Sequence, residues 1–338
     1  MPRRRFGDKP WRTLLENPDL KRWHTNVAQG SQVTADVYLR RLGAVSDRMG
    51  IPILDMPKMK EKEVHTMLLD FIAREQAEGK AGSAIHSTVK AVKSWLLHNG
   101  IKVNLPVKVR GAWDAPTLED ERTPSQEELR QILLAANSRD RVSCILMAHA
   151  GVRPGVIGNY LGDDGLRLKD LPELQIKRDR VEFSRSPAMV VVRPDLSKTG
   201  QKYFSFLSEE GCGYVKAYLE ERMRGGEKLS PESDLVRPQK MHKAFLTSIN
   251  VGDGIREAIR GAGFDWRPYV LRAYFDTQLL LAESQGKVAH DFRVFWMGHK
   301  GTMDARYTMW VPDIPRTLFL KLSVHPCPAG DGFGTKAP

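Results

Sequence analysis

The stretch that decides the fold class is residues 296–307, WMGHKGTMDARY. It sets His299 in a glycine-rich turn and places Tyr307 eight residues later. A phenolic hydroxyl has an ordinary pKa of about 10, so a tyrosine becomes a useful nucleophile only where cationic and hydrogen-bonding groups surround it. If Tyr307 carries chemistry, the rest of the chain must supply those groups.

Composition points toward a polyanionic partner. The 338 residues include 52 lysines and arginines against 41 acids, which gives a net charge of +11 and a pI near 9.5. Charge alone is equally typical of a soluble basic protein without such a partner. A chain of this length exceeds the usual size of one domain, so we expect two domains.

Cysteine usage and hydropathy narrow the class of protein. Cys144, Cys212 and Cys327 lie far apart, without the spacing of a disulfide framework or a zinc module. We therefore expect no metal or other cofactor, and a reducing compartment. The mean hydropathy is −0.40, no apolar run has the length of a membrane span, and the N-terminus lacks a signal-peptide core. A cytoplasmic protein with no membrane contact is expected.

The N-terminal third predicts a basic arm over residues 1–21 and a small helical domain over 22–100. Apolar residues recur at three- and four-residue steps from Ser31, from about residue 60 and from Ser83. Thr34 is the expected cap of the first of these helices, and Gly50 its end.

Basic residues follow the polar stripes of the first and third predicted helices. Rows of this kind are usually solvated helix faces, but they also fit a surface that contacts DNA phosphates. The candidate DNA-binding residues of this domain are Arg40, Arg41, His86, Lys90 and Lys93.

The chain between residues 101 and 121 loses periodicity, gains Pro and Gly and then turns acidic, which predicts an interdomain linker. A second domain is expected over 122–325, with short strands near 174–193, the last of them at 189–193, and a strand at 203–207 among its helices, and a flexible tail over 326–338. The predicted fold class is mainly α, with a small antiparallel β-sheet in the second of two domains.

Three motifs precede the histidine and the tyrosine. Arg153, in Gly-Val-Arg-Pro-Gly, lies between two helical patterns beside exposed helix N–H groups, a favourable phosphate site. The turn between the expected strands holds Lys198, with Lys202 as a competing lysine; either enters a DNA groove or is only a solubilising residue. Arg272 follows a core position near a helix start, where a buried charge needs a carboxylate or a bound anion.

In this order, the Gly-x-Arg junction, Ser-Lys-Thr-Gly, Leu-Arg, Gly-His and Tyr resemble the tyrosine recombinase family of phage-type integrases and Xer-like recombinases. The resemblance spans about residues 122–310, and the helical first domain resembles the core-binding domain of that family. It implies a two-domain clamp around DNA. It also implies a catalytic set of Arg153, Lys198, Arg272, His299 and Tyr307, with Tyr269 as a further candidate at the position three residues before Arg272 where the family usually has a histidine.

The resemblance further implies a mechanism. Tyr307 displaces the 5′-oxygen of deoxyribose and forms a 3′-phosphotyrosine, Lys198 protonates the leaving oxygen, and two arginines neutralise the phosphate without metal or ATP. A homotetramer on two paired sites in double-stranded DNA exchanges strands through a Holliday junction. The resemblance to compact, Xer-like or mobile-element enzymes places the protein with prokaryotic or viral DNA, associated with the nucleoid.

The chain departs from the family pattern at two positions. Tyr269 stands where the family usually has a histidine, three residues before Arg272, and a phenol is a poor proton acceptor at neutral pH. Val156 stands where an acidic residue usually follows the first arginine. The sequence therefore identifies neither the group that takes the proton of Tyr307 nor the group that orients Arg153.

Two other functions fit the same residues: DNA relaxation by a type IB topoisomerase, and DNA binding or replication control by a scaffold that has lost catalysis. The sequence leaves open the DNA site, the choice among integration, excision, resolution and inversion, and the need for an accessory DNA-bending protein. It also leaves open whether the apolar segment at 318–322 docks on its own core or on a neighbouring protomer.

Overall fold

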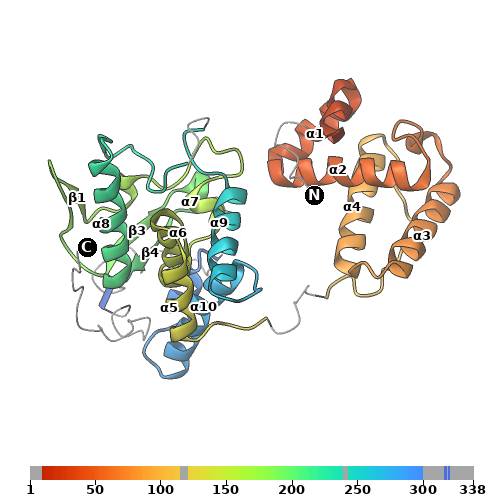
Figure 1. Ribbon diagram of the computed structural model, residues 1–338. Coiled ribbons are helices and arrows are strands. Elements are labelled where there is room, and N and C mark those ends of the chain that lie inside the picture. The colour runs from red at the N-terminus through yellow and green to blue at the C-terminus, as the bar shows by residue number, and fades with distance from the viewer. Residues whose placement is uncertain (1–9, 115–120, 239–242, 300–315, 318, 320–338) are drawn as a thin grey trace. The chain divides into compact units, whose positions relative to one another are not determined.

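The computed structural model describes residues 10–114, 121–238, 243–299, 316–317 and 319, and it divides into two compact units (Figure 1). The first unit ends at Thr117 and the second begins at Leu118. Each unit has a hydrophobic core of its own, so each is described by itself.

The first unit is helical across its described residues. Helix α2 packs against both α1 and α4 around a core that includes Trp23, Leu39 and Trp95. The indole N–H of Trp95 donates to the Ile53 carbonyl at 3.0 Å, which satisfies the polar atom of this buried ring. The elements are η1 (Pro10–Glu16), α1 (Pro18–Gly30), α2 (Gln32–Met49), η2 (Met56–Lys58), α3 (Glu61–Ala77) and α4 (Gly82–His98).

Two local expectations for this unit change. The hydroxyl of Ser31 accepts the Thr34 amide at 3.2 Å, so the cap of α2 is Ser31 and the prediction of Thr34 was wrong. Gly50 ends α2 in the left-handed region at φ 66°, as predicted. Helical structure already begins at Pro10, inside the segment expected to be an arm.

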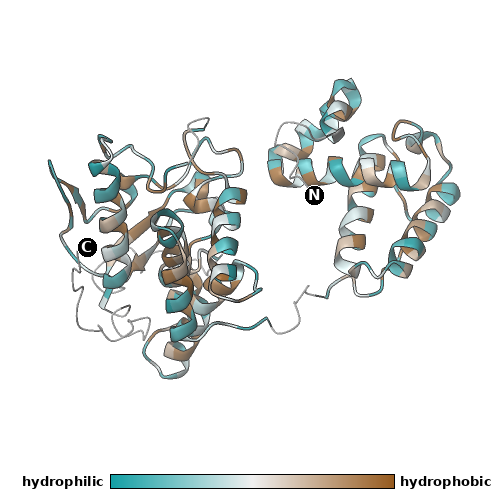
Figure 2. Ribbon diagram, viewed as in Figure 1, coloured by the Kyte–Doolittle hydropathy of each residue, from teal (hydrophilic) through white to brown (hydrophobic). Residues whose placement is uncertain are grey.

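The second unit is built around α6, which is buried along most of its length and packs against α5, α8, α9 and α10. Figure 2 shows hydrophobic residues concentrated on the helix faces that meet one another. Its helices are α5 (Gln126–Ala135), α6 (Ser138–His149), α7 (Pro154–Ile157), η3 (Leu168–Asp170), η4 (Pro194–Leu196), α8 (Glu209–Arg224), α9 (Ser248–Gly261), α10 (Tyr269–Ser284) and α11 (His290–Trp296).

The strands form two antiparallel pairs, β1 (Leu174–Ile176) with β2 (Val181–Phe183), and β3 (Ala188–Val192) with β4 (Tyr203–Leu207). Every residue of β4 is buried, because its alternate side chains enter two different cores. The mainly helical fold with small antiparallel strand pairs in the second unit is confirmed, and the strands expected near 174–193 form β1, β2 and β3.

The described end of the chain packs on its own unit. Phe319 is 1% exposed and contacts Phe206 and Trp296, with ring centroids 5.3 and 5.6 Å apart. Arg316 pairs with Glu173. The side chain of Phe319 therefore docks in cis, whereas Leu318, Leu320 and Leu322 lie outside the described residues. Within the described ranges, no helix combines the length and the apolarity that a bilayer crossing requires.

Candidate active site

Three backbone carbonyls bring the two predicted arginines together. Arg272, in the first turn of α10, donates to the carbonyls of Gly151 and Met297. Arg153, the residue that precedes α7, donates to the carbonyl of Gly298 at 3.4 Å. The junction between α6 and α7, the start of α10 and the turn after α11 therefore converge on one place.

Both turns that supply these carbonyls require glycine. Gly151 and Gly298 have φ values of 62° and 59°, in the left-handed region that ends helices. A Cβ atom on Gly151 would lie 2.2 Å from the ring of Phe275, and one on Gly298 would lie 2.5 Å from the ring of Tyr203. Glycine at each position thus lets a helix end close to a packed aromatic ring and direct its carbonyls toward the arginines.

Neither arginine is neutralised by a carboxylate within the part of the chain that the structure describes. Arg272 is 4% exposed, and burial together with the charge of Arg153 lowers its pKa to about 10, so it stays protonated at neutral pH. A carbonyl accepts a hydrogen bond but carries no compensating charge. The arrangement leaves two positive charges available to an anion.

This geometry answers one question that the sequence left open and corrects one expectation. The carbonyl of Gly298 orients Arg153, and Val156 is only a core residue, 1% exposed. For Arg272 we expected a carboxylate or a bound anion as the partner. The partners within the protein are carbonyls, so the carboxylate alternative is wrong for the described chain.

His299 follows directly on Gly298 at the edge of this cluster. Partial burial and the charges of Arg153 and Arg272 lower the pKa of its imidazole below the ordinary value. At neutral pH His299 is therefore a neutral ring that can both donate and accept a hydrogen bond. Tyr269, the first residue of α10, is 55% exposed, and its phenol acts electrostatically on Arg272.

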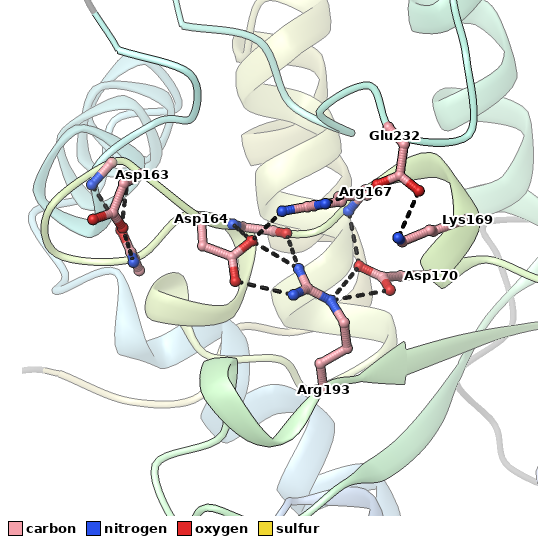
Figure 3. Close-up of polar contacts among 10 residues, drawn as sticks. Asp163, Asp164, Arg167, Lys169, Asp170, Arg193 and Glu232 are labelled. Carbon is pink, nitrogen blue, oxygen red and sulfur yellow. Dashed lines mark hydrogen bonds and ion pairs between the residues drawn. The ribbon is translucent and has the colours of Figure 1, made fainter.

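The hairpin that carries Lys198 is anchored by ion pairs at the end of β3 (Figure 3). Arg193 donates to both carboxylate oxygens of Asp164, at 3.0 and 2.9 Å, and to Asp170 at 3.3 Å. Burial acts to raise the pKa of Asp164, but hydrogen bonds from Arg193 and the Gly165 amide hold it below its ordinary value. Lys198 lies exposed in the turn beyond this anchor.

Lys198 is a predicted residue that does not contact the arginine cluster in the described structure. The described structure shows no contact between the amino group of Lys198 and either arginine, and Lys202, just before β4, is exposed. Tyr307 lies outside the described residues. Among the described side chains, no group of three or more His, Cys, Asp or Glu is arranged to hold a metal ion.

Comparison with known proteins addresses the fold. No family model matches this sequence, and the search of curated proteins finds no match. A solved lambda integrase (75–356) dimer bound to a COC′ core site is 19% identical at a TM-score of 0.50, covering 86% of this chain and 93% of that one. A lambda integrase tetramer bound to a Holliday junction is 18% identical at 0.50, covering 88% and 80%. The chain has the tyrosine recombinase fold.

A third solved structure has a lower score: XerH site-specific recombinase bound to a difH substrate, 16% identical, with a TM-score of 0.49 and coverage of 93% and 89%. At these identities the likeness of the chain to tyrosine recombinases establishes architecture. The residues that do chemistry have to be argued from the site itself.

The first unit of this tyrosine recombinase fold has a second candidate surface, which we call the α4 basic face: Arg40, Arg41, Lys90, Lys93 and Trp113. Arg41 joins α2 to the start of α4 by donating to the Ala84 carbonyl at 3.3 Å. Lys90 lies over the ring of Trp113, with its Nζ 5.1 Å from the ring centroid.

Trp113 was missed by the sequence reasoning, although its indole is 81% exposed. An isolated tryptophan in a linker-like stretch gives no periodic signal, and only the folded chain places it beside Lys90.

His86 stays a predicted DNA-binding residue, but as a neutral one. Its ring lies 4.9 Å from that of Trp113, its Nε2 is buried, and burial with Lys90 and Lys93 lowers its pKa, so it adds no charge to this face at neutral pH.

Proposed function

We propose that this protein is a site-specific DNA recombinase that cleaves and rejoins DNA through a covalent 3′-phosphotyrosine on Tyr307. The observation that carries the proposal is the pair of guanidiniums, Arg153 and Arg272, held by carbonyls and left without carboxylate partners in the described structure. Such a pair fits a phosphodiester, which gains negative charge on its non-bridging oxygens during in-line attack.

Each site residue has a role in this reaction. The Tyr307 oxygen attacks phosphorus, the bond to the 5′-oxygen breaks, and Lys198 gives that oxygen a proton. Neutral His299 donates a hydrogen bond to the phosphate. The phosphotyrosine keeps the energy of the broken ester, so a 5′-hydroxyl reverses the step and rejoins the DNA without ATP.

Tyr269 stands at the exposed start of α10, close enough to influence the charge of Arg272. Its phenol can donate a hydrogen bond to the same phosphate, which makes it a binding group. The proton of Tyr307 passes to a different acceptor, and we propose His299 because its lowered pKa keeps the imidazole neutral and able to accept.

The α4 basic face is proposed to bind duplex DNA. Arg40, Lys90 and Lys93 contact phosphates, and the exposed indole of Trp113 packs on the sugars or base edges beside them. Lys202 is proposed as a further phosphate contact next to the hairpin. The full reaction then uses a homotetramer on two paired sites and a Holliday junction, on prokaryotic or viral DNA.

The test uses a suicide duplex, nicked beside the cleavage point so that the cleaved fragment diffuses away and religation stops. Wild-type protein is expected to form a covalent adduct with the DNA, and Tyr307→Phe to form none, because only the phenol oxygen attacks. Tyr218→Phe, which removes a different phenol from the second unit, is the matched control and should form the adduct. An equal adduct in Tyr307→Phe would exclude this nucleophile.

The same DNA separates recombination from the alternatives. Strand exchange between two sites supports a recombinase, and relaxation of supercoils by a monomer without exchange supports a type IB topoisomerase. Binding without any adduct in the wild-type protein would identify a non-catalytic DNA-binding protein.

A further inference from the structure

The phenol of Tyr203 is a buried polar group that the mechanism above does not use. Tyr203 is the first residue of β4 and is 3% exposed, and its oxygen has no hydrogen-bond partner among the described residues. A buried hydroxyl without a hydrogen-bond partner is destabilising, because it has given up its bonds to water. A buried phenol without a partner at the edge of a candidate active site therefore calls for a functional reason.

The hydroxyl lies directly beneath the Gly298 turn. A Cβ atom on Gly298 would be 2.5 Å from the Cζ of Tyr203 and 2.9 Å from its oxygen. The carbonyls of Met297 and Gly298, in this same turn, accept from Arg272 and Arg153. Burial raises the pKa of Tyr203, while the charges of Arg272 and Arg153 oppose that rise. The oxygen is thus a neutral phenol within the field of both guanidiniums.

We infer that Tyr203 is a positioning residue of the cleavage site, whose oxygen accepts an N–H from Arg153 and Arg272 when a phosphate occupies the site. The inference rests on the proposed function. In the described structure carbonyls accept hydrogen bonds from each guanidinium, and neither Arg153 nor Arg272 forms an ion pair with a carboxylate there. A neutral acceptor orients the arginines without cancelling the charge that the phosphate needs.

The position of Tyr203 in the fold also links the hairpin to the arginines. Tyr203 pairs with Val192 in the β3–β4 ladder, and the turn that holds Lys198 joins these two residues. Fixing the phenol on the arginines therefore fixes one end of the hairpin against the cluster. The strand that positions Tyr203 and the turn that positions Lys198 become one rigid piece.

The experiment removes only the oxygen. Tyr203→Phe is compared with wild type and with Tyr218→Phe, whose oxygen accepts the Arg237 amide at 3.0 Å away from the site. In single-turnover cleavage of the suicide duplex we expect Tyr203→Phe to form adduct at least about 10-fold more slowly, with unchanged duplex affinity and Tm. Tyr218→Phe should cleave at the wild-type rate.

A substrate with a methylphosphonate at the cleaved position distinguishes positioning from a general structural effect. It replaces one charged oxygen by methyl, so the guanidiniums have less charge to neutralise. On this substrate the ratio of the wild-type cleavage rate to that of Tyr203→Phe should fall toward 1. An undiminished difference on this substrate, or no difference on the ordinary phosphodiester, would overturn the inference.

A measurement that needs no cleavage keeps the inference separate from the proposed function. Calorimetric titration with inorganic phosphate should show weaker binding to Tyr203→Phe than to wild type or Tyr218→Phe. If wild type forms no adduct, the proposed function fails while weaker phosphate binding by Tyr203→Phe still supports the positioning role. Equal affinities, or no phosphate binding by wild type, would refute it.

Discussion

Arg153 and Arg272 have neutral partners, which is uncommon for arginines in a folded core. A buried guanidinium is usually compensated by a carboxylate, because an uncompensated charge costs several kcal/mol in a medium of low dielectric constant. Here three carbonyls accept the hydrogen bonds of the two guanidiniums but do not compensate their positive charges. Burial lowers the pKa of Arg272 to about 10. The free protein bears this cost, and the phosphate that we propose as the ligand would remove it.

Gly298 should be intolerant of a side chain for two separate reasons. Gly298→Ala would put an alanine at a left-handed φ of 59°, which is strained for any residue with a side chain. Its new Cβ atom would also lie 2.5 Å from the ring of Tyr203. Gly226, with φ 86° and open space around it, isolates the first effect. In urea unfolding we expect Gly226→Ala to lose about 1 kcal/mol and Gly298→Ala at least about 2 kcal/mol.

The outcome for Gly298→Ala depends on Tyr203, which provides a further check. In a background of Tyr203→Leu the overlap disappears, so the cost of Gly298→Ala should fall toward that of Gly226→Ala. Equal costs in both backgrounds would show that the turn does not lie on the Tyr203 ring.

At the scale of residues, sequence reasoning placed Arg272 beside the core and grouped it with Arg153. It did not find the carbonyl acceptors or Tyr203. Met297 and Gly298 lie far along the chain from Arg153, and no periodicity marks a buried tyrosine whose hydroxyl lacks a partner. The same limit applied to His86, which a helical repeat places on an open face and which Trp113 partly covers.

At the scale of elements, the β3–β4 hairpin depends on the ion pairs at its base. Arg193→Met would remove the bidentate partner of Asp164, which keeps a guanidinium contact only from Arg167 at 3.3 Å, and would leave the carboxylate of Asp170, which is 4% exposed, without its guanidinium. We expect the free energy of unfolding to fall by about 1–3 kcal/mol. Trypsin should also cut faster at Lys198 and Lys202, because the turn loses its anchor.

Arg180→Met is the matched control for this substitution. Arg180 pairs with Glu182 at 2.7 Å, but the side chain of Arg180 is 56% exposed and that of Glu182 is 34% exposed. Exposed pairs contribute about 0–1 kcal/mol, so this variant should unfold and digest like wild type. Similar losses in the two variants would mean that the Arg193 network is no more than a surface contact.

The helices and strands themselves were largely predictable. The apolar repeats from Ser31, residue 60 and Ser83 became α2, α3 and α4, and the strands predicted at 189–193 and 203–207 became β3 and β4 within one residue. These patterns are local, because a helix or strand must place its apolar residues on one side. The cap of α2 was misplaced because Ser31 and Thr34 are both good capping residues. Ser31 is the cap because it has the extended backbone that a cap requires, and its side chain accepts the Thr34 amide.

At the scale of the whole molecule, the net charge of +11 predicts DNA binding that weakens steeply with salt. Two variants of the α4 basic face separate its contributions. Lys90→Gln should reduce the slope of log affinity against log salt by about 1, since one phosphate contact is lost. Trp113→Ala should weaken binding severalfold at every salt concentration without changing the slope, since no charge is removed.

Fluorescence anisotropy with a labelled duplex measures both effects across a salt series. Glu78→Gln, a charge change in the turn after α3, is the control and should leave the affinity near that of wild type. If Trp113→Ala binds the duplex with wild-type affinity, the indole of Trp113 is not part of the DNA-binding surface. An unchanged slope of log affinity against log salt in Lys90→Gln would exclude Lys90 as a phosphate contact.

The sequence by itself determined the two-part, mainly helical architecture and the types of residue available for phosphate chemistry. Both depend on local information, namely apolar periodicity, turn residues and charge. Only the tertiary structure decided what holds those residues: the carbonyls at Gly151, Met297 and Gly298, the phenol of Tyr203 beneath them, and the anchor at Arg193. These contacts join residues far apart in the chain, where packing and burial choose the partner and no local pattern records the choice.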